Sequence, residues 1–289
     1  MKKDTLLITG SQGFIASNFI NRFKDKYNFL QIVRDKKKNI FLKKNKDYHI
    51  YKKRNINNLI SFLKKNKPKL VIHFGSLFIA EHKPNQINKL IESNVLFGNH
   101  ILESMLKSEC KKIINIETSW QNYNNSRQYN PTCLYAATKE AFKKILFFYH
   151  KAHEFNVINI KLFDTYGSND KRKKIFNYLL KKKKLNLTRG MQKINLLHVD
   201  DVCDGIERCS NILLKKNVSF VDYGLGSKKN YTLKLLIKKF IKINNLSIKI
   251  FWGKKKYKVR EIFKPYNKYE KIPGWKEKVN IKNGFNYKK

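Results

Sequence analysis

The sequence predicts an α/β fold, with a doubly wound parallel sheet and a smaller C-terminal lobe. Short apolar runs alternate with segments of helical periodicity over the first 163 residues, and this alternation is typical of parallel sheets flanked by helices. A glycine-containing turn joins the first run to the first helical segment. At 289 residues and 42% hydrophobic composition, the chain is long and apolar enough to bury a core.

The predicted strands are short apolar runs that read as buried parallel strands. In chain order they cover residues 5–9, 30–33, 70–74, 112–117 and 157–163. The predicted helices carry apolar residues at helical spacing and cover 14–23, 57–65, 86–108 and 135–154. After Phe163 the pattern is less regular. Residues 1–164 and 195–222 are therefore assigned to the sheet domain, and residues 165–194 and 223–289 to the lobe.

Composition excludes several classes of protein. The formal net charge is +42, but the excess is mostly lysine scattered along the chain, which predicts a solvated surface and no specific nucleic-acid partner. No apolar run reaches the roughly 20 residues of a membrane span. The N-terminus lacks the apolar core of a signal peptide, which predicts a cytoplasmic protein. Four cysteines without zinc-site spacing predict reduced thiols and no metal.

The first turn, TGSQGFIAS at residues 9–17, predicts a dinucleotide site. Gly10 and Gly13 allow a tight turn and a close approach to a pyrophosphate, which the N-terminus of the next helix then faces. Ala16 takes the third glycine position. The turn therefore predicts a Rossmann fold for this part of the chain. The expected cofactor contacts there are Gly10, Gln12, Gly13, Phe14 and Ile15.

The end of the second predicted strand bears on cofactor choice. A carboxylate at this point binds the adenosine ribose of NAD, whereas an arginine accommodates the 2′-phosphate of NADP. Arg34 occupies the position, so NADP(H) is favoured. NAD(H) stays possible if Asp35 binds the ribose instead.

Tyr135 and Lys139 lie four residues apart at the start of a predicted helix, so they share one helical face. A nearby ammonium is expected to lower the pKa of the phenol and make it a proton donor or acceptor near neutral pH. The lysine can also hydrogen-bond the ribose of a nicotinamide. Ser119, with Thr118 as the weaker candidate, follows the strand at 112–117 and is expected to hold a substrate oxygen.

TGSQGFIAS, Ser119 and YAATK resemble the extended short-chain dehydrogenase/reductase family, whose members act mainly on nucleotide sugars. The resemblance continues through VIHFGS at 71–76, Asn94, KLFDTYGSND at 161–170, NLLHVDDV at 195–202 and PGWKEKV at 273–279. It implies an NAD(P)-dependent enzyme with Ser119, Tyr135 and Lys139 as catalytic residues.

The resemblance also implies further binding residues. Additional cofactor contacts would be Asn55, Ile56, Phe74, Gly75, Ser76, Asn94 and Phe163, with Asn55 replacing a usual aspartate. Substrate contacts would be Ser119, Trp120, Asp164, Arg172 and His198. Arg172 is expected to bind the substrate diphosphate through its bidentate guanidinium.

The resemblance leaves three functions open. Dehydratases of the family carry an Asp-Glu pair directly after the catalytic Ser or Thr, and Trp120 and Gln121 stand there instead, which disfavours dehydration. NADPH-dependent reduction of a nucleotide-linked 4-keto-deoxysugar in surface polysaccharide biosynthesis is favoured, by Arg34 and by similarity to the branch that contains CDP-abequose synthase. An NAD-dependent nucleotide-sugar 4-epimerase is the alternative, and a non-catalytic NADP-binding regulator is the alternative from another class.

A homodimer is also expected. The helix after Tyr135 carries more apolar residues than one face needs, namely Phe142, Ile145, Leu146, Phe148 and Tyr149. The surplus would form the helix-bundle dimer interface usual in the family.

Overall fold

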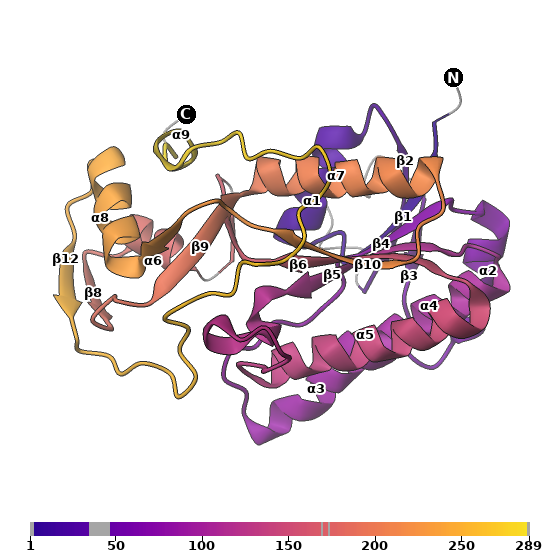
Figure 1. The fold of residues 1–289 in the computed structure, drawn as a ribbon, viewed down its shortest axis with the longest axis horizontal. Helices are drawn as coiled ribbons and strands as arrows, with labels where there is room; N and C mark the ends of the chain where they lie inside the picture. Colours follow the sequence, from indigo (N-terminus) through magenta and orange to yellow (C-terminus); the bar gives the residue numbers. More distant parts are fainter. Residues whose placement is uncertain (1–2, 35–46, 169, 173, 288–289) are drawn as a thin grey trace.

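A computed structural model describes residues 3–34, 47–168, 170–172 and 174–287. Its centre is a seven-stranded sheet in the order β10-β6-β5-β4-β1-β2-β3, in which every neighbouring pair is parallel (Figure 1). The strands are β1 (Thr5–Thr9), β2 (Asn28–Val33), β3 (Tyr48–Ile50), β4 (Leu70–His73), β5 (Lys112–Thr118), β6 (Asn156–Leu162) and β10 (Phe220–Leu225). The chain adds strands outward in both directions from β1, as a doubly wound sheet does.

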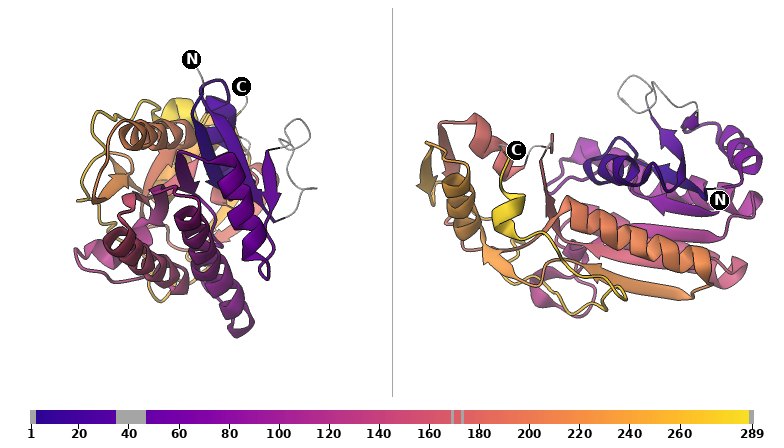
Figure 2. Two further views of the ribbon diagram at one scale, coloured as in Figure 1. Left: turned by 90° about the vertical axis from the view of Figure 1, so that its right-hand side faces the viewer. Right: turned by 90° about the horizontal axis from the view of Figure 1, so that it is seen from above.

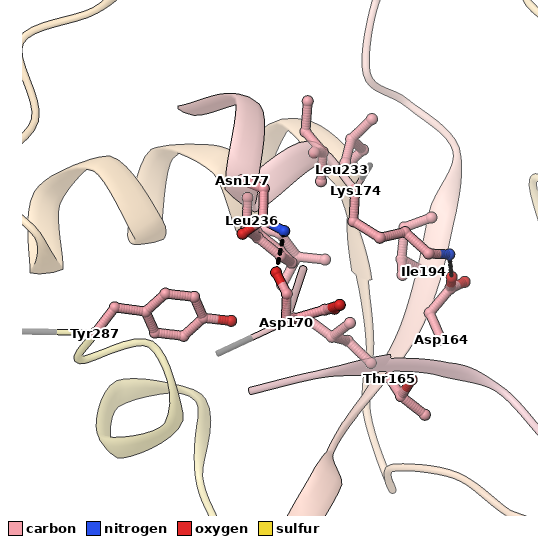
Figure 3. A pocket seen from close by; sticks show the side chains of 12 residues that line it. Asp164, Thr165, Asp170, Lys174, Asn177, Ile194, Leu233, Leu236 and Tyr287 are labelled. Carbon is pink, nitrogen blue, oxygen red and sulfur yellow. Dashed lines mark hydrogen bonds and ion pairs between the residues drawn. The ribbon is translucent and has the colours of Figure 1, made fainter. Parts of the chain in front are cut away.

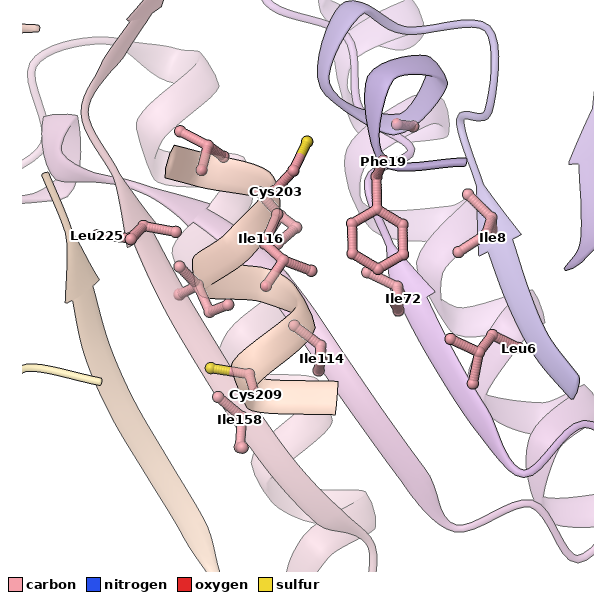
Figure 4. Packing of buried hydrophobic residues seen from close by; sticks show 14 of the residues in the cluster. Leu6, Ile8, Phe19, Ile72, Ile114, Ile116, Ile158, Cys203, Cys209 and Leu225 are labelled. Atoms are coloured by element: carbon pink, nitrogen blue, oxygen red, sulfur yellow. The ribbon is translucent and has the colours of Figure 1, made fainter. Parts of the chain in front are cut away.

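Helices cover both faces of this sheet (Figure 2). On one face lie α1 (Phe14–Phe23) and α7 (Val199–Lys215). Figure 4 shows Phe19 of α1 and Cys203 and Cys209 of α7 packed over the isoleucines of the sheet. The other face carries α2 (Ile56–Asn66), α4 (Phe97–Lys107) and α5 (Leu134–His153). The core is therefore two apolar layers separated by the sheet, as the strand pattern predicts.

The predicted elements of the first half are confirmed within one or two residues, with two differences. The short edge strand β3, at Tyr48–Ile50, is not among the predicted strands. Residues 86–108 form two helices, α3 (Ile87–Ile91) and α4, separated by a π-helical turn at Glu92–Leu96. Asn94 lies in this turn, where its side chain is buried and hydrogen-bonded to other segments. The wider turn is a local feature that hydrophobic periodicity does not reveal.

The second lobe is smaller and more irregular. It contains the three-stranded sheet β11-β9-β7, the two-stranded sheet β12-β8 and three helices around an aromatic-rich core. Its elements are β7 (Asp164–Tyr166), α6 (Ile175–Lys181), β8 (Lys184–Leu187), β9 (Lys193–His198), β11 (Asn230–Thr232), α8 (Leu233–Ile243), β12 (Lys249–Trp252) and α9 (Ile281–Gly284). The α/β fold class is confirmed. The predicted boundary at residue 222 stays a prediction, and β10 continues in the main sheet to Leu225.

The strand order reverses at β1, which lies between β4 and β2. Here the Thr9 hydroxyl accepts a hydrogen bond from the Gly75 amide, 3.0 Å away, and lies 2.9 Å from the buried ring of His73. These contacts fix the carboxyl ends of β1 and β4 relative to each other. Ligands of open parallel sheets bind at such a reversal, so the fold places a site above these two strands.

Candidate active site

The turn after β1 forms one wall of a cavity of about 610 Å³. Gly10 has a φ of +65°, and a Cβ added there would lie 2.9 Å from the backbone of Gly75. Gly13 caps α1 without any side-chain hydrogen bond, so backbone N–H groups at this helix end stay available to an anion. The close approach of the two loops and the uncapped helix end fit a pyrophosphate.

Several predicted cofactor residues meet in this cavity. Gly10, Gln12, Gly13, Arg34, Phe74, Gly75 and Ser76 line it. Three further residues that the sequence interpretation missed line it too: Tyr51, Lys53 and Lys89. Tyr51 and Lys53 follow β3, and Lys89 lies on α3. The two lysines belong to no motif and cannot be distinguished by sequence from the many other lysines of the chain. Asp35, the alternative ribose ligand, lies outside the described residues.

A second cavity, of about 580 Å³, adjoins the same turn and extends towards α5. It shares Gly10, Gly13, Phe74 and Ser76 with the first cavity, and Tyr135 is in its wall. Of the other predicted residues, Phe14, Ile15, Trp120, Phe163, Asp164 and Arg172 also line it. The phenol that the sequence singles out therefore faces the space next to the predicted pyrophosphate site.

Tyr135 and Lys139 lie on the first two turns of α5, and Lys139 is 1% exposed. The Tyr135 ring packs edge-on against Phe78, with ring centroids 5.0 Å apart, and Phe78 packs in the same way against Trp120. Tyr135 thus lines the second cavity, while Lys139 is buried one helical turn further along the same face of α5.

The electrostatics of Tyr135 differ from the sequence-based expectation. Burial raises the pKa of its phenol, partly offset by a hydrogen bond from Ser76, so the expected net lowering by Lys139 is wrong. The physical reason is that the aromatic wall excludes the water a phenolate needs. Burial also lowers the pKa of Lys139 to about 8, against the opposing effect of Glu117.

The residues at the end of β5 and directly after it differ in what their side chains contact. The Thr118 hydroxyl accepts a hydrogen bond from the Trp120 amide at 3.3 Å and so caps the short turn that follows. Ser119 and Trp120 line a third cavity, of about 330 Å³. Gln121 is fully buried, donates to the Glu140 carboxylate at 2.6 Å and accepts from the Thr118 amide at 3.2 Å. Its side chain is committed to protein partners, while Ser119 borders open space.

The third cavity also contains charged residues that the sequence interpretation missed. Lys258 and Arg260 line it together with Ser119, Trp120 and Asp164. The Lys258 ammonium lies 5.1 Å from the centroid of the Trp120 ring, and the Arg260 guanidinium lies 4.1 Å from that of Tyr123. Both cations belong to a segment after β12 that has no regular secondary structure. A periodic sequence pattern therefore could not predict where these side chains lie.

Arg172 lies apart from these cations. Its guanidinium binds both carboxylate oxygens of Asp170, at 2.7 and 2.8 Å, and the Thr165 carbonyl at 2.9 Å. It stacks over the Phe14 ring, 4.4 Å from the centroid, so it faces the first turn and the second cavity. Figure 3 shows the neighbouring pair, Lys174 and Asp164, which are 3.6 Å apart.

Comparison with known proteins shows the family of the chain. Residues 6–212 match the NAD dependent epimerase/dehydratase family. The chain belongs to this family. It is therefore an enzyme of the extended short-chain dehydrogenase/reductase type, as the sequence motifs predict.

Relatives of this epimerase/dehydratase chain match 95% or more of its length. It is 27% identical to CDP-abequose synthase of Yersinia pseudotuberculosis, over 95% of the chain and 96% of the relative. It is 25% identical to a protein of Methanocaldococcus jannaschii whose function is not characterised, over 98% and 94%. Among solved structures, UDP-glucose 4-epimerase of Thermotoga maritima has a TM-score of 0.84 at 17% identity, covering 98% and 96% of the two chains. The likeness to the solved structure shows the shared fold.

Other predicted residues of the epimerase/dehydratase chain have structural partners. The Asn94 amide bridges both backbone groups of Leu77 and the Thr138 hydroxyl, at 2.6 to 3.0 Å, and so holds the Ser76–Phe78 segment against α5. Asn55 caps α2 through a hydrogen bond from the Asn58 amide, and Ile56 begins that helix. His198 caps α7, accepting from the Asp200 amide at 3.2 Å. Direct ligand contacts of these residues stay predictions.

The remaining findings concern the cysteines, metal binding and membrane-spanning helices. All four cysteines are free thiols, and no cluster of metal-ligating side chains occurs among the residues the structure describes. Within that same part of the chain, no helix is both long and apolar enough to cross a bilayer.

Proposed function

We propose that this protein reduces the keto group of a nucleotide-linked 4-keto-deoxysugar with NADPH. The observation that carries the proposal is the position of Tyr135, in the wall of a cavity that also contains Gly10, Gly13 and Trp120. Trp120 also lines the third cavity, which contains Ser119. The turn after β1, Tyr135 and Ser119 therefore all line cavities that share the Trp120 side chain.

The electrostatics favour proton donation. A nicotinamide in the second cavity would supply a hydride when bound. Because burial raises the pKa of Tyr135, the phenol keeps its proton at neutral pH and can give it to the oxygen of the reduced carbon. Ser119 would donate a hydrogen bond to that oxygen, and Lys139, one helical turn after Tyr135, would hold the cofactor ribose.

Dehydration is disfavoured by the two residues after Ser119. The Trp120 indole has no acid or base function, and the Gln121 amide is buried against Glu140 and Thr118. Neither side chain can expel a hydroxyl group. The relationship to CDP-abequose synthase supports a reductase, although 27% identity leaves the sugar and the nucleotide open.

NADPH is preferred over NADH in this proposal because cations border the adenosine cavity. Arg34, Lys53 and Lys89 line it, and Lys53 is paired with Glu92. A 2′-phosphate is a dianion that an arginine binds through two parallel hydrogen bonds. Other solved structures of similar fold, such as UDP-glucose 4-epimerase of Thermus thermophilus, are described with NAD. The ratio of NADPH to NADH affinity is therefore the test of this preference.

For the substrate diphosphate, Lys258 and Arg260 are better candidates than Arg172. They line the cavity of Ser119, whereas Arg172 is held by Asp170 over the Phe14 ring and faces the first turn. Arg172 would then help to bind the cofactor.

We also propose a homodimer. Phe148 on α5 is 57% exposed, and Ile87 and Ile91 on α3 are 40% and 43% exposed. Because α3 packs on α5, these side chains belong to neighbouring helices on the outside of one layer (Figure 1). Light scattering should give about twice the 34.4 kDa chain mass, and a monomer mass would contradict the proposal.

The reaction is tested with NADPH and a panel of nucleotide-linked 4-keto sugars, following the loss of NADPH absorbance. Tyr135→Phe should reduce turnover by about 10² to 10⁴ while cofactor affinity stays within a few-fold. Retained turnover in this variant would refute the proton donor. Interconversion of 4-epimers with NAD, without net NADPH consumption, would show an epimerase instead.

A further inference from the structure

A buried amide and a carboxylate form a pair beside the candidate catalytic serine. Gln121, fully buried in the turn after β5, donates to the Glu140 carboxylate of α5 at 2.6 Å. Its side-chain oxygen accepts from the Thr118 amide at 3.2 Å, and the Thr118 hydroxyl accepts from the Trp120 amide at 3.3 Å. Because both ends of a buried amide need hydrogen-bond partners, these contacts fix the direction of the Gln121 side chain and with it the Ser119 turn.

Glu140 is itself held in place by charged neighbours. Its two carboxylate oxygens each lie 3.9 Å from an ammonium group, that of Lys144 on the same helix and that of Lys161 on β6. Lys161 in turn lies 2.5 Å from the carboxylate of Glu117, whose side chain is completely buried. Glu117 lies on β5, two residues before Ser119. The contacts therefore form a closed loop from β5 through β6 and α5 back to the turn.

This loop of contacts joins two groups of the candidate active site. The helix α5 carries Tyr135 as well as Glu140, and Tyr135 lines the second cavity. Ser119 lines the third cavity, and Trp120, the next residue, lines both. Because Gln121 links the turn to α5, the helix that carries the phenol also determines where the serine lies.

Backbone hydrogen bonds hold the other side of the turn. The Trp120 carbonyl accepts from the Thr132 amide at 2.9 Å. The Gln121 carbonyl accepts from the Asn130 amide at the same distance. Neither bond involves the Gln121 side chain, so a change of that side chain should shift Ser119 while the turn stays folded.

We propose that Glu140 is a positioning residue of the candidate active site, which sets the place of the Ser119 hydroxyl relative to the Tyr135 phenol by fixing Gln121. The inference rests on the proposed function, because it takes the serine and the phenol to act on the same substrate oxygen. Glu140 acts through Gln121, without contact with substrate.

The test reverses the hydrogen bond between the two side chains. Gln121→Glu sets two carboxylates against each other, and their repulsion should displace the turn. The kcat of the proposed reduction should fall by about 10- to 100-fold, because a small misplacement of a catalytic group is costly. NADPH affinity should stay within a few-fold of wild type, since other segments form the first cavity.

The double variant Gln121→Glu/Glu140→Gln should recover a kcat within a few-fold of wild type. In it the new amide on α5 donates to the new carboxylate, which still accepts from the Thr118 amide. Absence of this recovery would overturn the proposal. If Gln121→Glu does not fold, Glu140→Ala replaces it, because it removes only the acceptor. Its kcat should fall about 10-fold with NADPH affinity unchanged, and a wild-type kcat would refute the role of Glu140.

Asn211→Asp is the matched control. The Asn211 amide donates to the Glu207 carboxylate on α7 at 2.7 Å, and the Glu207 side chain is 15% exposed, as is that of Glu140. This pair contacts the Tyr27 phenol, beyond the end of α1. The control should lose a similar amount of stability with an unchanged kcat. Equal losses of kcat in Asn211→Asp and Gln121→Glu would show a general effect of stability and overturn the positioning role.

Hydrogen exchange of the turn separates the two hypotheses, because it needs no substrate. Gln121→Glu should speed exchange of the Thr118 and Trp120 amides, and the double variant should restore their protection. If wild type consumes no NADPH with any 4-keto sugar while this pattern is seen, the proposed function fails and the control of the turn by Glu140 stands. If wild type is active and Gln121→Glu changes neither exchange nor kcat, the function stands and the positioning role is refuted.

Discussion

The first cavity, proposed for the cofactor, and the third cavity, proposed for the substrate, are built from different parts of the chain. The first is shaped by backbone, since Gly10 and Gly75 approach so closely that a Cβ on Gly10 would overlap the neighbouring main chain. The third cavity is shaped by long side chains, with Lys258 and Arg260 over aromatic rings. Substitution of a glycine in the first cavity would distort the backbone and so the whole cavity. In the third cavity, single charged side chains can be replaced without changing the backbone.

The largest effect is expected at Gly10. Gly10→Ala places a methyl group 2.9 Å from the Gly75 backbone and forces alanine into a left-handed conformation with φ near +65°. Relieving the overlap must move one of the two loops, so NADPH affinity should fall by about 100-fold or more, with roughly 1–2 kcal/mol lost from the free energy of unfolding. Calorimetric titration and chemical denaturation measure the two quantities.

Gly253→Ala is the matched control. Gly253 has a φ of +79°, but an added Cβ would meet only the Arg189 side chain at 3.6 Å. It should show a similar loss of stability with unchanged cofactor affinity. If Gly10→Ala also keeps wild-type affinity, the backbone description of the cofactor cavity is wrong.

The same contrast explains what could be predicted from the sequence. The β1–turn–α1 unit was predicted residue for residue, because a buried strand, two glycines and an amphipathic helix are local patterns. The pairing of Tyr135 with Lys139 follows in the same way from helix periodicity. Gly10, Gln12 and Gly13 of this turn line the first cavity, and Phe74, Gly75 and Ser76, which the family resemblance implies, line it as well.

The other half of the site depends on contacts between distant residues. The direction of Arg172 is set by Asp170 and the Phe14 ring, and the pKa of Tyr135 is set by its aromatic surroundings. Lys258 reaches the Trp120 ring from a segment without regular structure. In a chain with 63 lysines and arginines, composition cannot distinguish such a residue from the solvated surface.

An intermediate effect is expected at Lys258. Lys258→Ala removes one cation from the cavity of Ser119 and Trp120, and should raise the KM for a nucleotide sugar about 10-fold, because a hydrogen bond to a charged group contributes roughly 1.5–3 kcal/mol. The kcat and the affinity for NADPH should change little. Lys256→Ala, an exposed lysine of the same segment, should leave KM unchanged. Equal effects of the two variants would mean that only general surface charge attracts the substrate.

The smallest effect is expected at Arg34, because it is exposed at the rim of the cofactor cavity and screened by water. Arg34→Ala should weaken NADPH binding by up to about 10-fold and leave NADH binding nearly unchanged, since only NADPH carries the 2′-phosphate. The difference should shrink at high salt. Arg22→Ala, on α1 and paired with Asp204, should alter neither affinity. If Arg34→Ala weakens both cofactors equally, the side chain does not discriminate between them, and selectivity must come from the backbone-lined cavity itself.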